Sequence, residues 1–547
     1  MRASILCGAL LLAASAPAQR NVSGSTNVPE QDCFDVKSYE LRLALDVEHQ
    51  AIDGSLRMRA HMLADSARIA LDLDDELDVK AVIVAGHQAK HEHRELRVWV
   101  DLDPPAKKGE DVDVTVTYGG TPRVAPNPPW QGGFTWAKTP GGAPWIATTC
   151  QGEGADLWWP CKDQPDDEPD TMDLWIEVPK SLVVAANGTL ASDETKGDRR
   201  TFHWHIANPI NPYCVALNIA PYAIVKQTYT CIDGTKTPAW FFALPENEKK
   251  AAAMLPQFLA HLRQLEEVCG PYPFRNEKYG VVETPHLGME HQTIIAYGNG
   301  FRGESDGYDW LHHHELSHEW WGNLVTNRDW KDMWIHEGIG TYMQALYLEK
   351  TRGREGYLAE MRAKRGGMMN RGPVAPREHR DSYQIYFTLS GNDIYNKGSW
   401  ICHSLRWLLG DKVFFEVLRR WAYPDPAKEK VTDGSQCRTV DTDEFLAIAE
   451  KVSGRKLDWF FELYLRQPKL PRLDVEEKDG VLHLAWHTPS DLPFPMPVEV
   501  RIGDQVRRVE MPDGEAQVKV GSAKWQVDPD DWVLRENQAV APGRRRR

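Results

Sequence analysis

The sequence predicts a multidomain α+β protein with an N-terminal β-rich domain, a mostly helical central domain and a small C-terminal β-sandwich. Its 547 residues exceed the size at which one hydrophobic core stops growing, which favours two to four domains. Short runs of alternating polar and apolar residues fill residues 34–228 and return after residue 471. Residues 246–465 instead show helical spacing.

The N-terminal β-rich domain is predicted from period-two alternation. Residues 39–47 and 112–118 place every second apolar side chain on one face, and Gly, Pro and Asp interrupt such runs. A sheet built from these strands buries one face and exposes the other. We assign this domain to residues 19–228.

The central domain, residues 229–466, is predicted from apolar residues spaced three and four apart. Its first helix is expected at 246–268, where Ala, Leu and Phe recur at these intervals. Alternation then returns at 481–486, 498–502 and 517–520. These runs predict the C-terminal β-sandwich, residues 467–538.

Both ends of the chain carry patterns that are separate from the folded domains. Met1 and Arg2 precede an apolar run and the small-x-small group at 16–18, which predicts a signal peptide, residues 1–18, and export to the periplasm or the extracellular space. No apolar run reaches the roughly 20 residues that a membrane-spanning helix needs. Residues 539–547 form a short basic tail.

The charge balance excludes one class of function. The chain has 64 Lys and Arg against 79 Asp and Glu, a formal net charge of -15, which argues against a nucleic-acid-binding protein that neutralises phosphates. The cysteines are widely and irregularly spaced, matching neither a zinc knuckle nor a small disulfide scaffold. Neither a disulfide pairing nor an oligomeric state is predicted.

The segment 311–324 reads as an apolar, aromatic helix and contains the pattern H-E-x-x-H. His314 and His318 are four residues apart and share one helix face, where both can point a ring nitrogen at one metal ion. Glu315 lies beside that face and can reach an attacking water without being a ligand. The alternative is a helix with a solvated histidine cluster, which the two preceding histidines would extend.

A catalytic zinc ion needs a third protein ligand and an open fourth position. Glu337 is the candidate, because residues 323–330 read as a turn into a second helix that can return a carboxylate to the histidine face. Its neighbours are apolar, which indicates a buried stretch where an unpaired charge is costly. His336 is the competing ligand, and a surface acid is the alternative without function.

These segments resemble the aminopeptidase N and leukotriene hydrolase family of gluzincin metallopeptidases, whose pattern is H-E-x-x-H, an eighteen-residue spacer and a glutamate. The resemblance implies a thermolysin-like fold for the central domain. It also implies one zinc ion (Zn2+) per chain, held by His314, His318 and Glu337, with Glu315 as the general base. His336 departs from the asparagine that many members carry before the ligand glutamate.

An enzyme that cuts only at the N-terminus must recognise an ammonium group, and a fixed carboxylate does this by a charge-assisted hydrogen bond. Gly288, Met289 and Glu290 resemble the family's Gly-x-Met-Glu-Asn loop, with His291 in place of the asparagine. The resemblance implies that the backbone of this loop lies along the substrate and that Glu290 binds the α-amine. The alternative is an ordinary loop acid.

Residues 148–154 resemble the family's segment that lines the first specificity pocket. The resemblance implies that Gln151 also contacts the amine. Glu153 is close enough in sequence to be an alternative, and so is a buried strand without a role in binding.

Tyr395 begins a Tyr-Asn-Lys-Gly sequence that resembles the family's Tyr-x-Lys-Gly, whose tyrosine hydroxyl donates to the oxyanion. Tyr383 and Tyr386 are nearby alternatives. Removing one such donor typically lowers the rate by about a hundred- to a thousand-fold.

Together these residues predict an exported zinc-dependent aminopeptidase that hydrolyses N-terminal residues from peptides with a free N-terminus. Glu315 would take a proton from water and pass it to the departing amine. A zinc endopeptidase without the amine clamp is the nearest alternative. A non-catalytic peptide-binding protein that retains the fold and a lipid epoxide hydrolase are the others.

Overall fold

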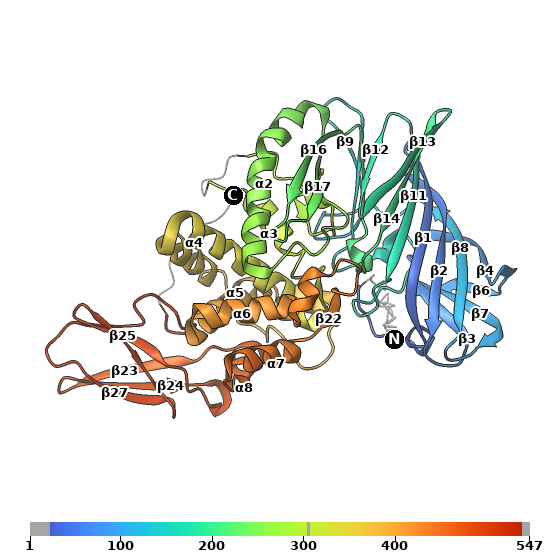
Figure 1. Ribbon diagram of the computed structural model, residues 1–547. Helices are drawn as coiled ribbons and strands as arrows, with labels where there is room; N and C mark the ends of the chain where they lie inside the picture. Colours follow the sequence, from blue (N-terminus) through green and yellow to red (C-terminus); the bar gives the residue numbers. More distant parts are fainter. Residues whose placement is uncertain (1–21, 303–306, 539–547) are drawn as a thin grey trace, which may run out of the picture.

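The computed structural model describes residues 22–302 and 307–538. The predicted signal peptide and the basic tail lie outside the described residues. Figure 1 shows three parts in chain order: a β-rich part at one end, a helical centre, and a second β part at the far end. The predicted α+β class, with its β-rich, helical and β regions, is confirmed.

An eight-stranded sheet dominates the N-terminal part. Its strands, in spatial order, are β13 (Thr189–Lys196), β14 (Arg199–Ile206), β11 (Thr171–Pro179), β1 (Phe34–Asp46), β2 (Ala51–Met62), β8 (Asp111–Gly120), β4 (Leu77–Val84) and β5 (His87–Gln88). In β1, Leu41, Leu43 and Leu45 are buried while Arg42 and Ala44 between them are not. The predicted alternation therefore gives one core face and one solvent face.

Two smaller sheets and one short helix complete this part. One sheet contains β3 (Ser66–Asp72), β7 (Arg97–Ala106) and β6 (His91–Arg94). The other contains β12 (Val183–Ala186), β15 (Leu217–Ala220), β10 (Pro144–Thr149) and β9 (Gly133–Lys138), and the helix is α1 (Pro29–Asp32). Strand β10 leads directly into the turn that carries Gln151.

The central part opens with a five-stranded sheet. Its order is β16 (Ala223–Thr230), β17 (Lys236–Ala243), β18 (Tyr279–Glu283), β20 (Ile295–Tyr297) and β19 (Gly288–Met289). Strand β16 spans the predicted domain limit at residue 228, and its pairing with β17 joins it to this sheet. Strand β19 lies at the sheet edge, so one side of its backbone is not used by the sheet.

The helices of the central part follow. They are α2 (Glu248–Cys269), α3 (Trp310–Ser317), α4 (Trp334–Arg365), α5 (Asp393–Leu409), α6 (Asp411–Ala422), α7 (Thr442–Ser453) and α8 (Asp458–Arg466). A two-stranded sheet of β21 (Val325–Asn327) and β22 (Arg438–Val440) lies among them. None of the helices in the described residues has both the length and the apolar character needed to cross a bilayer.

The structure confirms one predicted helix and shortens another. The helix predicted at 246–268 is α2, whose buried residues recur at three- and four-residue spacing and which ends at Gly270, where φ is +106°. The helix predicted at 311–324 is wrong beyond Ser317. There the backbone turns, because the N–H groups of Asn323 and Val325 bond to carbonyl oxygens five residues back and Gly322 adopts a φ of +147°. This turn sends the chain back toward α3 as α4.

The C-terminal part consists of two three-stranded sheets. They contain β23 (Arg472–Lys478), β24 (Val481–His487) and β27 (Glu515–Lys519), and β26 (Gln505–Val509), β25 (Val498–Ile502) and β28 (Trp525–Val527). The predicted strands at 481–486, 498–502 and 517–520 correspond to β24, β25 and β27. The eight cysteines of the described part have free thiols.

Candidate active site

Helices α3 and α4 bring together three side chains that could share one metal ion. His314 and His318 lie at the end of α3, and Glu337 lies in the first turn of α4. The two Nε2 atoms are 3.4 Å apart. Glu337 Oε2 lies 3.4 Å from His314 Nε2 and 3.5 Å from His318 Nε2. Within the described residues these three are the group of His, Cys, Asp and Glu side chains that could share one ion.

The triangle of ligand atoms fits a zinc ion. Tetrahedral coordination with bonds of about 2.0–2.1 Å needs ligand atoms about 3.3–3.4 Å apart, close to the observed spacing. Glu337 Oε2 is buried without a hydrogen-bond partner, which is costly unless a cation satisfies it. His318 Nδ1 lies 2.9 Å from the Trp321 carbonyl oxygen. Donation of a proton to that oxygen leaves Nε2 free to bind metal.

His336, the competing ligand, lies outside this group. Its Nε2 accepts a hydrogen bond of 3.0 Å from the backbone N–H of Asn327. The ring is fully buried, and burial lowers its pKa well below the ordinary range. Because Nε2 is used to fix the turn before α4, the geometry favours Glu337 over His336 as the third ligand.

Glu315 lies beside the metal triangle and against strand β19. It is 7% exposed, and burial raises the pKa of its carboxyl well above the ordinary range, with the carboxylates of Glu290 and Glu337 adding to the shift. A Cβ at Gly288 would lie only 2.8 Å from Glu315 Oε1. Glycine therefore lets the edge strand approach the carboxyl. The carboxyl of Glu315, which can carry a proton, therefore lies next to the edge strand β19.

Glu290 and Gln151 contact each other although they lie in different parts of the chain. Gln151 Nε2 donates to Glu290 Oε1 at 2.5 Å, and the Tyr213 hydroxyl donates to the same oxygen at 3.1 Å. Gln151 Nε2 is also 3.4 Å from Glu337 Oε1. The side chain of Met289 is buried, and its backbone pairs with Ala296 in β20. The paired carboxylate and amide thus lie one contact away from the metal triangle.

Glu153, the alternative to Gln151, points elsewhere. Its carboxylate accepts hydrogen bonds from Arg123 at 2.9 Å and from the backbone N–H of Gly132. These partners hold the loop that precedes β9. The structure therefore brings Gln151 to the candidate site and leaves Glu153 in a salt bridge.

Two tyrosines donate to the metal-binding carboxylate. The hydroxyl of Tyr395 is 2.9 Å from Glu337 Oε1, and that of Tyr386 is 3.2 Å from the same atom. Tyr386 lies in a π-helical turn, Gln384–Leu389, a rare conformation that occurs frequently at functional sites. Tyr383 instead packs against the exposed Phe387. Of the two alternative tyrosines, Tyr386 donates to the same Glu337 oxygen as Tyr395, whereas the ring of Tyr383 packs on Phe387.

Two family models match the chain. The peptidase M1 N-terminal domain matches residues 36–214, and the peptidase family M1 domain matches residues 279–464, which contain the metal triangle. The chain belongs to peptidase family M1. The predicted family is thereby confirmed, and with it the prediction of a zinc metallopeptidase whose candidate metal site is formed by His314, His318 and Glu337.

This M1 peptidase is similar to the leukotriene A-4 hydrolase of Xenopus laevis, with 25% identity over 343 residues, 57% of this chain and 51% of the relative. It is also similar to leucine aminopeptidase 2 of Neurospora crassa, with 24% identity over 509 residues, 87% of this chain and 73% of the relative. The chain thus spans about half of the first relative's length and about three quarters of the second's.

Among solved structures, the M1 peptidase resembles an M1 zinc metallopeptidase from Deinococcus radiodurans, with a TM-score of 0.66 and 22% identity over 80% of this chain and 95% of the other. A mutant of that protein bound to a Tyr-Ser-Ala substrate gives a TM-score of 0.65 at 23% identity. The likeness shows that the two chains share a fold.

Sequence reasoning missed two residues of the M1 peptidase site. Tyr213 donates to Glu290 from a 3-10 turn, Pro212–Cys214, in the N-terminal part. Trp330 packs against both Tyr213 and Tyr386, with ring centroids 5.9 Å and 6.1 Å apart. A lone buried aromatic residue carries no local pattern that separates this role from ordinary packing.

Proposed function

We propose that this M1 peptidase is an aminopeptidase that removes the first residue from peptides with a free N-terminus. One observation carries the proposal: Gln151 links Glu290 to Glu337, at 2.5 Å and 3.4 Å. An ammonium group bound by Glu290 and Gln151 would leave room for one residue before the metal triangle. The first peptide bond is then the one within reach.

Zinc bound by His314, His318 and Glu337 would polarise the substrate carbonyl and lower the pKa of water. We assign the proton transfers to Glu315, which takes a proton from water and gives it to the departing amine. Tyr395 donates its hydroxyl to the oxyanion.

The substrate backbone can be held by strand β19. Because Gly288 and Met289 form the edge of the five-stranded sheet, an extended peptide can add to the sheet through main-chain hydrogen bonds. Peptide substrates are further supported by the similar Deinococcus radiodurans structure with Tyr-Ser-Ala. Short peptides are therefore the proposed substrate class.

Export is the second part of the proposal. It is supported by the signal-peptide pattern of residues 1–18. Expression of the full chain in a bacterial host, followed by mass spectrometry of the N-terminus, should find cleavage after Ala18. Recovery of the intact chain from the cytoplasm alone would contradict export.

The function is tested with a leucyl peptide offered with a free and with an acetylated N-terminus. We expect hydrolysis of the free peptide, loss of at least about a hundredfold on acetylation because the charge-assisted contact to Glu290 is removed, and loss of activity with a zinc chelator. Equal hydrolysis of both peptides would identify an endopeptidase.

The role of Glu315 is tested by Glu315→Gln. The amide keeps the shape of the side chain and cannot accept the proton, so kcat should fall by about a hundred- to ten-thousand-fold. Zinc content, measured by atomic absorption, should equal that of the wild type because Glu315 is not a ligand. Loss of zinc from this variant would contradict the assignment.

A further inference from the structure

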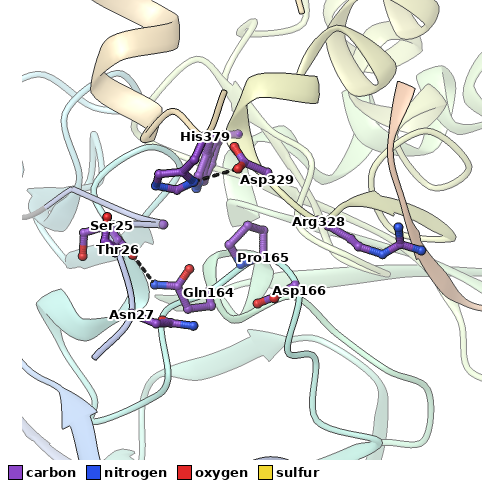
Figure 2. Close-up of a pocket in the computed structure, with 11 residues that line it drawn as sticks. Ser25, Thr26, Asn27, Gln164, Pro165, Asp166, Arg328, Asp329 and His379 are labelled. Carbon is purple, nitrogen blue, oxygen red and sulfur yellow. Dashed lines mark hydrogen bonds and ion pairs between the residues drawn. The ribbon is translucent and has the colours of Figure 1, made fainter. Parts of the chain in front are cut away.

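A segment ahead of the matched family domains lies against the wall of the active site. We name residues 23–27 the N-terminal strap; the family match begins at residue 36. Figure 2 shows the strap on one side of a pocket of about 180 Å³, where Gln164 Nε2 donates a hydrogen bond of 2.6 Å to the carbonyl oxygen of Ser25. The strap itself lies outside the matched domains, and a side chain of the matched N-terminal domain holds it in place.

The strap bonds to the turn that carries Gln151. The N–H of Ser23 donates to the carbonyl oxygen of Gly152 at 3.4 Å, and the carbonyl oxygen of Ser23 accepts from the N–H of Ser382 at 3.4 Å. The hydroxyl of Ser382 donates a short hydrogen bond to Gly152 as well. Because Gly152 directly follows Gln151, these bonds fix the turn from which Gln151 reaches Glu290.

Gly24 packs on the edge of the Trp330 indole. Its φ is +68°, and a Cβ at this position would lie 2.6 Å from Trp330 Nε1 and still closer to Cδ1. Trp330 is 2% exposed, so the ring has little room to yield. Both the left-handed backbone and the lack of space therefore select glycine.

The Trp330 indole connects Gly24 to the site. Its ring contacts Tyr213, which donates to Glu290, and Tyr386, which donates to Glu337. A shift of the indole would move both hydroxyl donors. The strap thus reaches Glu290 through the packing of Gly24 on Trp330, one contact between aromatic rings and one hydrogen bond.

We propose that the N-terminal strap positions the amine-binding end of the active site, with Gly24 acting through Trp330 and Ser23 acting through Gly152. This inference rests on the proposed aminopeptidase function. The strap residues are positioning residues, because they act through other side chains. Since Gln151 and Glu290 bind the amine, loss of the strap contacts raises KM for free-amine substrates more than it lowers kcat.

The test measures KM and kcat of Gly24→Ala and Ser382→Ala with leucyl-p-nitroanilide. We expect KM to rise about tenfold in Gly24→Ala and about threefold in Ser382→Ala, with kcat within about a factor of three of the wild type, because small displacements of a binding group are costly. Partial unfolding would instead reduce the active fraction, which lowers kcat and leaves KM unchanged.

Two matched controls show whether a change in KM comes from the site of the substitution or from the type of substitution alone. Gly197→Ala places a Cβ at a φ of +66° with no atom within 4 Å, and Ser404→Ala removes a buried hydroxyl bonded at 2.8 Å to the carbonyl oxygen of Trp532. Both controls should keep the wild-type KM. In addition, Gly24→Ala combined with Trp330→Phe should raise KM no more than Trp330→Phe alone, because the smaller ring frees the space.

Wild-type KM values in both Gly24→Ala and Ser382→Ala would overturn the proposal. If Gly24→Ala does not fold, Gln164→Ala decides, because it removes the hydrogen bond of 2.6 Å to the Ser25 carbonyl oxygen. A KM raised about threefold in Gln164→Ala supports the proposal, and a wild-type KM overturns it. A wild-type protein without aminopeptidase activity would contradict the proposed function instead, so the two failures are distinguishable.

Discussion

At the scale of single residues, Glu337 is the point where the site converges. One carboxylate oxygen faces the two imidazoles, and the other accepts hydrogen bonds from Tyr395, Tyr386 and Gln151. One side chain therefore joins the metal triangle to the tyrosine donors and to Glu290 and Gln151, the proposed amine-binding pair. A change at any of these partners is expected to act on the metal as well as on the substrate.

The two tyrosines on Glu337 are predicted to differ in kinetics. Tyr395 lies beside His314, with ring centroids 6.2 Å apart, whereas Tyr386 packs on Trp330. Tyr395→Phe should therefore lower kcat by about a hundred- to a thousand-fold, as expected for an oxyanion donor. Tyr386→Phe should lower kcat by only about tenfold, the scale of one hydrogen bond to a charged group.

Steady-state kinetics of both tyrosine variants, with zinc content measured alongside, checks this prediction. A loss in Tyr386→Phe that equals or exceeds that in Tyr395→Phe would transfer the oxyanion role to Tyr386. Tyr383→Phe is the control, because its ring packs against Phe387 and should have little effect on kcat.

At the scale of secondary structure, α3 is only eight residues long, contains His314 and has His318 as its C-cap. Its N-cap, Asp309, accepts hydrogen bonds from the His312 N–H at 3.0 Å, the Tyr297 hydroxyl at 2.7 Å and the Asn299 side chain at 2.9 Å. A helix this short has little stability of its own. The cap therefore ties the metal-binding helix to the end of β20.

Asp309→Ala is predicted to destabilise the fold by about 2 to 4 kcal/mol, because it removes a helix cap and the buried carboxylate that accepts three hydrogen bonds. Zinc affinity should fall as well, since α3 holds two of the ligands. Asp441→Ala is the control. Asp441 is the N-cap of α7 and accepts a hydrogen bond from the Glu444 N–H, so its loss should lower folding stability by about 1 kcal/mol.

Denaturant unfolding and competitive zinc titration measure the two effects of these cap variants. Equal zinc affinity in Asp309→Ala and Asp441→Ala would mean that the cap does not organise the metal site.

At the scale of the whole molecule, the candidate site lies where the N-terminal and central parts meet. Gln151 and Tyr213 come from the N-terminal part, and Glu290 comes from the central part, as do the ligands and Tyr395. Three carboxylates, Glu290, Glu315 and Glu337, are buried together, and burial raises the pKa of each. A bound cation would stabilise this group of acids and the contact between the two parts.

Removal of zinc is therefore predicted to lower Tm. A ligand that binds only the folded state stabilises it by about 4 kcal/mol at a thousand times its dissociation constant, so a chelator should shift Tm downward by several degrees. Calorimetry with and without chelator, in the wild type and in Glu337→Gln, measures the shift. An equal shift in both proteins would contradict zinc binding at this triangle.

The sequence predicted the features that repeat over short distances. Strand alternation at 39–47, helix periodicity at 246–268 and the four-residue spacing of His314 and His318 follow from the geometry of one strand or one turn of helix. The turn and second helix after His318 suggested Glu337, the resemblance to a family added Glu290 and Tyr395, and the structure brings these residues together. The roles of the individual site residues stay predictions.

By itself, the sequence determined the order of the β and helical regions and the metal-binding pattern, because each is expressed in residues close along the chain. Only the tertiary structure decided that α3 ends at Ser317, that Gln151 and not Glu153 reaches Glu290, and that Gly24 packs on Trp330. These outcomes depend on hydrogen bonds and packing between segments far apart in sequence. No local period encodes which distant partner a buried polar group or aromatic ring will meet.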